Sequence, residues 1–223
     1  MTAQQISARD LLRETFASTG SLYAPLLIIN SPSLIFTALN SFGNLGSAGI
    51  TFNIIYWFVA IPLLSGTLIF YTYRSLTRNQ VTVGQAFNQA NRRLLHIILV
   101  NILCTLLVLA GFIALIIPGL YVSYRLIFSC YATVIDNSSA LDSLSSSWEL
   151  TKGRWWLVCR ATCLIVFVVF VPIILISLFI ALTGQSLASQ IASNLLAFLA
   201  TPFINIYFVL LYLRVRESAA TIE

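Results

Sequence analysis

The chain has 223 residues, of which 59% are hydrophobic and only 9% are charged. A soluble domain carries about 25% charged residues, and its core could not bury so much apolar surface. The composition therefore excludes a soluble enzyme, a nucleic-acid-binding protein and a disordered chain, although the formal net charge is +5.

Charged residues are absent from three long stretches of the sequence, 15–73, 94–124 and 161–213. A membrane-spanning helix needs about 20 apolar residues, so these stretches have room for about five or six helices. We expect them in pairs, over 20–40 and 50–74, 94–117 and 119–135, and 155–182 and 189–214. Pro118-Gly119 predicts a tight turn between the third and fourth helices. A single re-entrant segment is the alternative for 119–135, which is the shortest of the six and contains Arg125.

A short amphipathic segment precedes each pair of predicted spans, over 7–16, 82–91 and 139–148. Each segment opens with Ser or Thr, which commonly cap helix N-termini, and we expect each to form a helix at the membrane interface. The expected fold is an all-α integral membrane protein with one domain, 1–223. Three hairpins, each behind its interfacial helix, form the pseudo-repeats 6–74, 81–135 and 138–214. The alternative is that these segments are only the polar connections that any protein with six spans needs.

The third interfacial segment, 138–152, carries apolar residues at helical spacing. We expect Leu141, Leu144 and Trp148 to face inward, and the exposed positions to be Ser143, Ser146 and Lys152. The helix should end at Gly153, because a residue without Cβ suits the position after a helix.

Basic residues gather on one side of the predicted spans. The connections near 41–49, 118–119 and 183–188 carry no charge, whereas 75–93 and 136–154 carry basic residues. The positive-inside rule predicts that 75–93, 136–154 and both termini face the cytoplasm. We expect a multi-pass protein of a bacterial inner membrane or internal membrane.

The sequence indicates no catalytic or metal-binding set. The predicted spans contain no Asp or Glu, and no Gly-rich phosphate loop occurs. Cys159 and Cys163 share a helix face, but the only histidine, His96, lies in another predicted helix, so a complete ligand set is hard to build. We expect no enzyme activity, no cofactor and no metal.

Prolines interrupt four of the predicted spans, and polar residues accompany several of them. A proline inside a helix leaves a backbone carbonyl without its hydrogen bond and kinks the helix. The polar groups nearby could line a cavity between helices or form interhelical hydrogen bonds. The relevant segments are Asn30-Ser31-Pro32, Thr201-Pro202 with Asn205, and Asn101 inside the third span.

Arg125 is the most unusual residue of the chain. In a continuous helix it would lie roughly 16 Å from Asp136, near the middle of the hydrocarbon layer. An arginine at that depth is costly, so it should have partners. The candidates are Glu149 first, then Asp136, Asn101 and the carbonyls freed at Pro172 or Pro202. The alternative is that Arg125 binds a lipid phosphate or an acidic group of a partner.

Two motifs resemble a known family. The first is Ile117-Pro-Gly-Leu-Tyr-Val-Ser-Tyr-Arg-Leu126, and the second is Ser147-Trp-Glu-Leu-Thr-Lys-Gly-Arg-Trp155. Together they resemble the membrane-domain family of certain bacterial glycerophosphoryl diester phosphodiesterases. The matching positions are Pro118, Gly119, Tyr121, Arg125 and 147–154. The resemblance implies a stand-alone membrane domain, because the phosphodiesterase activity belongs to a separate soluble barrel whose ligands this chain lacks.

The expected function is that of a non-catalytic membrane protein. It would act as an accessory subunit, a scaffold or a lipid-associating subunit of a bacterial membrane complex. The alternative is a transporter of lipids or small molecules with a cavity between the proline-broken helices. Expected partners are membrane lipids and another membrane protein or a second copy of the chain, with no nucleic acid.

Overall fold

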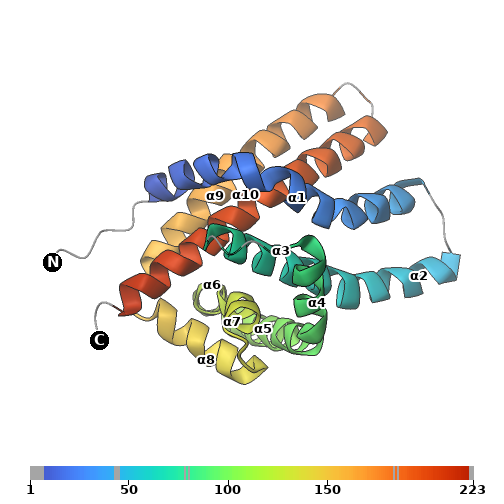
Figure 1. Ribbon diagram of the computed structural model, residues 1–223. Coiled ribbons are helices and arrows are strands. Elements are labelled where there is room, and N and C mark those ends of the chain that lie inside the picture. The colour runs from blue at the N-terminus through green and yellow to red at the C-terminus, as the bar shows by residue number, and fades with distance from the viewer. Residues whose placement is uncertain are drawn as a thin grey trace.

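The computed structural model describes residues 8–42, 46–77, 79, 81–182, 184 and 186–220. Within these residues every regular element is a helix (Figure 1). The elements are α1 (Ala8–Phe42), α2 (Gly46–Ile55), the π-helical turn η1 (Tyr56–Ala60), α3 (Ile61–Leu76), α4 (Val83–Arg92), α5 (Leu94–Ala114), α6 (Ile116–Arg125), α7 (Ser129–Ile135), α8 (Ala140–Thr151), α9 (Trp155–Ala181) and α10 (Ser186–Ala220).

Five helical stretches of the described chain are long and apolar enough to cross a membrane. They are Arg9–Thr37, Gly49–Leu76, Leu94–Ala114, Trp155–Ala181 and Gln190–Ala220. Large apolar side chains lie exposed on them, as at Ile113 (78%) on α5 and Phe179 (72%) on α9. Such faces suit lipid rather than water, so the all-helical fold is consistent with a membrane protein, as the composition predicts.

The prediction of one spanning helix over 119–135 is wrong. α6 ends at Arg125, α7 begins at Ser129, and residues 126–128 between them are not helical. At about 1.5 Å per residue, neither helix alone reaches across a hydrocarbon core of about 30 Å. α6 packs against α5, and α7 packs against α8. After α5, the chain therefore continues as two short helices, α6 and α7, which are separated by the non-helical residues 126–128.

The turn between α5 and α6 lies at Leu115, three residues before the predicted Pro118-Gly119. Leu115 has an extended backbone (φ −173°, ψ 161°), and Pro118 falls in the first turn of α6, where no helical N–H bond is lost. A Cβ on Gly111 would lie 2.9 Å from the Gly119 Cα, and one on Gly119 would lie 2.6 Å from Cγ of Phe112. α5 and α6 therefore approach as closely as glycine alone permits.

Two of the three predicted interfacial segments form separate helices, α4 and α8. Thr82 caps α4 through a reciprocal capping box with Gln85. Ser139 caps α8 by accepting a hydrogen bond from the Asp142 N–H. α8 ends at Thr151, and Gly153 follows with φ +73°, in agreement with the predicted stop.

The first predicted interfacial segment is not separate from the first span. α1 continues unbroken from Ala8 to Phe42, and residues 8–19 contain no Gly or Pro that would end a helix. The predicted cap at Ser7 lies outside the described residues.

The longest helix–helix contact joins α1 to α10, which run antiparallel (Figure 1). Arg214 pairs with Glu14 at 3.0 Å, and the Tyr23 hydroxyl donates to the Leu199 carbonyl at 2.9 Å. The start of α1 and the end of α10 consequently lie at the same end of the bundle.

Candidate anion site at Arg125

Arg125, the last residue of α6, is buried, with 4% of its surface exposed. Its guanidinium carbon lies 4.4 Å from the ring centroid of Trp148 and 5.7 Å from that of Tyr121. Its Nε is buried without a hydrogen-bond partner. Among the described residues, no ion pair joins Arg125 to a carboxylate. Among the described side chains, it is the rings of Trp148 and Tyr121 that compensate this largely desolvated charge.

The break after Arg125 is held by hydroxyl groups of α8. The Ser147 hydroxyl donates to the Arg125 carbonyl at 2.8 Å and accepts from the Phe128 N–H at 3.2 Å. The Thr151 hydroxyl lies 3.2 Å from the same carbonyl. A break in a helix frees backbone groups that need partners when buried. Ser147 and Thr151 supply these partners and so fix the position of Arg125.

The inward face of α8 is therefore polar. The predictions that Leu141 and Trp148 face inward and that Ser143 is exposed are wrong, whereas Lys152 is exposed as predicted. Ser143, Ser147 and Thr151 are fully buried, and Ser143 accepts a hydrogen bond from Thr133 at 2.8 Å. In contrast, Leu141 is 70% exposed and Trp148 37% exposed. An apolar side chain loses nothing by facing lipid, whereas the α6–α7 break needs hydroxyl groups, so the polar stripe takes the interior.

Four aromatic side chains form a run of ring contacts that begins at Arg125. The Tyr121 ring lies 6.0 Å from Trp148 and 6.0 Å from Trp155, and Trp155 lies 5.4 Å from Trp156. We call these four residues the aromatic rim. Each is more than one third exposed. Since Trp155 begins α9, the rim lies at one end of a helix long enough to span.

This arrangement changes the expected depth of Arg125. Tryptophan and tyrosine favour the level where hydrocarbon meets headgroups, and the rim lies at such a helix end. The expectation of a mid-membrane position assumed a continuous helix from Arg125 to Asp136, which the break at 126–128 removes. The distance along a helix from Asp136 therefore no longer places Arg125 at mid-membrane.

A model of the uncharacterised protein family UPF0259 matches residues 51–214. The chain belongs to UPF0259. The match includes both motifs on which the resemblance to the phosphodiesterase membrane domains was based, so that resemblance is wrong. Comparisons with curated proteins and with solved structures gave no match for this UPF0259 chain.

The UPF0259 fold brings Trp148 to Arg125 but none of the predicted polar partners. Glu149 pairs with Lys152 at 4.0 Å, where both side chains are mostly exposed. Asp136 pairs with Arg216 at 2.7 Å and accepts a hydrogen bond from the Tyr212 hydroxyl at 2.5 Å.

The neutral candidates do not reach Arg125 either. Asn101 is exposed on α5, and no hydrogen bond joins Arg125 to a carbonyl near Pro172 or Pro202 in the described chain. Pro118 and Gly119 have the structural roles described above.

The cysteines of this UPF0259 chain were the remaining candidates for a metal site. The four cysteines are free, and the Cys163 sulfur lies 3.7 Å from the Tyr124 hydroxyl. Within the described residues, no three side chains of His, Cys, Asp or Glu gather in a way that could hold a metal ion.

Proposed function

We propose that this UPF0259 protein is a non-catalytic, lipid-associating membrane protein that binds the phosphate of an anionic lipid headgroup at Arg125. One observation carries the proposal: a buried guanidinium stacked on Trp148, with no carboxylate on it in the described chain and with its Nε unpaired. A guanidinium presents a planar fork of donors that matches two phosphate oxygens.

The surroundings of Arg125 favour a lipid over a soluble anion. The rings of Tyr121 and Trp148 are 39% and 37% exposed, so they are the cover that a headgroup would displace. Lys152, Arg154 and Arg160 lie around the start of α9 and add positive potential at the same level. The proposal therefore places the phosphate between the aromatic rim and the guanidinium, with the acyl chains along α9.

The proposal also covers the membrane in which the protein acts and its role there. The protein would belong to a bacterial inner membrane or internal membrane and serve there as an accessory subunit. The exposed apolar faces of α5 and α9 offer surface for a neighbouring membrane protein or a second copy of the chain. No reaction is part of the proposal.

The lipid site can be tested with the purified protein in phosphatidylcholine nanodiscs. Binding of phosphatidylglycerol, measured by native mass spectrometry, should weaken about tenfold or more in Arg125→Leu, because a charge-assisted bidentate contact is lost. Arg92→Leu is the matched control, since it removes the same charge from an exposed position on α4, away from the aromatic rim. It should bind phosphatidylglycerol as the wild type does.

Thermal stability separates this proposal from a purely structural role of Arg125. A lipid site predicts that Arg125→Leu, without added anionic lipid, is at least as stable as the wild type, because a buried unpaired charge is removed. A structural tie through the rings predicts a loss of stability and unchanged phosphatidylglycerol binding. That second pair of results would overturn the proposal.

The proposed orientation has its own test. The charge pattern predicts that segments 75–93 and 136–154 face the cytoplasm. In a variant without native cysteines, a membrane-impermeant thiol reagent added to intact cells should label a cysteine at Ser47 but not at Asn79 or Ser145. Labelling of the latter two without cell lysis would reverse the topology.

A further inference from the structure

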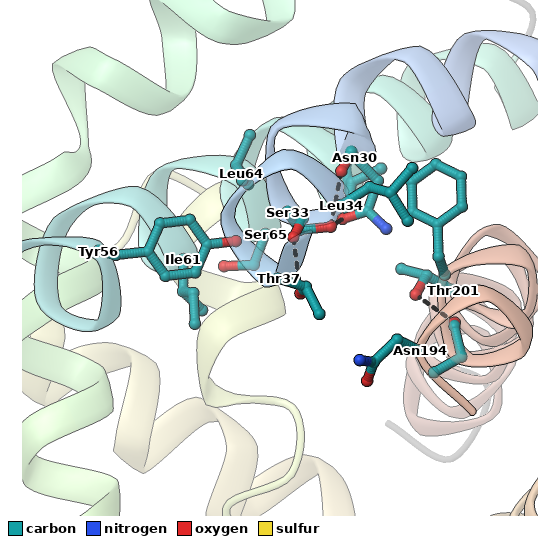
Figure 2. A pocket seen from close by; sticks show the side chains of 13 residues that line it. Asn30, Ser33, Leu34, Thr37, Tyr56, Ile61, Leu64, Ser65, Asn194 and Thr201 are labelled. Carbon is teal, nitrogen blue, oxygen red and sulfur yellow. Dashed lines mark hydrogen bonds between the residues drawn. The ribbon is translucent and has the colours of Figure 1, made fainter. Parts of the chain in front are cut away.

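A second candidate site lies between α1, α3 and α10, apart from Arg125. It is a pocket of about 360 Å³ (Figure 2), within the size range of small-molecule sites. No charged residue lines it. Its polar lining includes Asn30 and Ser33 of α1, Tyr56 and Ser65 of η1 and α3, and Asn194 and Thr201 of α10.

Two amide groups in this pocket have unused hydrogen-bonding capacity. Asn30 is only 8% exposed; its Oδ1 accepts from the Ser33 hydroxyl at 3.0 Å, but its amide nitrogen has no acceptor within the described chain. The Asn194 side chain has no hydrogen-bond partner there at all. Figure 2 shows the Asn194 amide pointing from α10 into the space beside α1. Asn30 is buried and Asn194 is half-buried, and both amides have donors left for a ligand in the pocket.

Prolines in two helices, Pro32 in α1 and Pro62 in α3, lie close in sequence to residues that line the pocket. Pro32 has no N–H for the Ile28 carbonyl, and the Ser31 hydroxyl donates to that carbonyl instead at 2.8 Å. Before Pro62, the helix widens into η1, where the Ile61 N–H bonds the Tyr56 carbonyl. Such π turns are frequent at functional sites. Here the turn carries Tyr56, whose hydroxyl points toward Ser65 in Figure 2.

We propose that this pocket binds the uncharged glycerol-ester region of a neutral lipid of the diacylglycerol class. Its amides and hydroxyls can donate to ester carbonyls and accept from a glycerol hydroxyl. A phosphate would enter without a counter-charge, which a low-dielectric site disfavours. Leu34, Leu64 and Phe198 complete the lining and suit the first carbons of acyl chains. Because the walls belong to helices long enough to span, the chains can continue into the bilayer.

A photoreactive diacylglycerol with a diazirine in its acyl chain tests the proposal. The full chain, in phosphatidylcholine nanodiscs, should be labelled on peptides from α1 and α10. Dioleoylglycerol should prevent this labelling at concentrations at least about tenfold lower than dioleoyl phosphatidate requires, and free glycerol should not prevent it. Equal competition by phosphatidate, or competition by glycerol, would overturn the choice of a neutral lipid.

Substitutions of residues that line the pocket test whether the probe is bound there. Asn194→Leu should weaken binding of the probe about three- to tenfold, the effect of one lost hydrogen bond. Ala197→Phe, which fills the pocket from an exposed position on α10, should reduce labelling at least as much. Asn101→Leu is the matched control, because it removes the same amide from an exposed position on α5 and should bind normally.

The variants also keep the two proposed sites distinct. Arg125→Leu should leave labelling by the diacylglycerol probe unchanged, and Asn194→Leu should leave phosphatidylglycerol binding unchanged. Labelling that persists in both Asn194→Leu and Ala197→Phe would rule out this pocket as the diacylglycerol site, whatever the outcome at Arg125. Absence of labelling in the wild-type protein would do the same.

Discussion

Replacing Ser147 and Thr151 together by Ala should lower the free energy of unfolding by about 2–6 kcal/mol, because each buried backbone group left without a partner costs about 1–3 kcal/mol. The two groups are the Phe128 N–H and the Arg125 carbonyl, both bonded by Ser147. Unfolding in mixed micelles of mild detergent and sodium dodecyl sulfate would measure the loss.

The single variants should not add up to the double variant. In Ser147→Ala, the Thr151 hydroxyl can still donate to the Arg125 carbonyl, from which it lies 3.2 Å. In Thr151→Ala, Ser147 keeps both of its bonds. The double variant should therefore lose more stability than the sum of the two. Ser145→Ala, at an exposed position of α8, is the control and should be neutral. Strict additivity would show that α8 does not support the break.

Gly111→Leu should destabilise the protein by about 1–3 kcal/mol, the usual cost of overpacking. A Cβ at this position would lie 2.9 Å from the Cα of Gly119, a backbone atom that cannot turn away. α5 and α6 must then separate, and this separation shifts the helix that ends at Arg125. The measurement is again detergent unfolding, combined with phosphatidylglycerol binding.

Gly20→Leu provides the comparison for Gly111→Leu. A Cβ at Gly20 of α1 meets no atom within 4 Å, so the same substitution should be tolerated there. Equal stability of the two leucine variants would contradict the close approach of α5 and α6.

The spans and the helix caps could be predicted because they depend on local sequence. Long charge-free stretches determine where a chain can cross a membrane, and five of the predicted spans correspond to helices long enough to do so. Thr82 and Ser139 form the expected caps because capping needs only the residues of the first turn.

The break between α6 and α7 could not be predicted in the same way. Residues 126–128 are Leu, Ile and Phe, and none of these ends a helix by itself. The stabilising partners come from α8, later in the chain. A signal did exist: Ser143, Ser147 and Thr151 recur every four residues and so share one helix face. The prediction that the apolar stripe of α8 faces inward follows the rule for soluble proteins, in which apolar residues are buried. That rule does not hold where the surroundings are lipid.

The pocket was partly predictable. Polar residues beside Pro32 and Pro202 indicated a possible cavity, and Asn30 and Thr201 do line one. Asn205 instead accepts a hydrogen bond from Thr72 at 2.8 Å, the alternative considered for such residues. Asn194 and Tyr56 carry no such signal, because only the packing of α10 against α1 and the π turn before Pro62 bring them to the same space.

The pairing of α1 with α10 has a consequence for how the protein is made. α1 emerges from the ribosome first among the described helices, and its main neighbour emerges last. Until α10 is inserted, Glu14 lacks Arg214, the Tyr23 hydroxyl lacks the Leu199 carbonyl, and Phe16 lacks Phe203, whose ring centroid lies 4.7 Å away. The contacts between α1 and α10 can therefore form only after α10 has been made, whereas pairs of consecutive helices such as α5 and α6 can pack earlier.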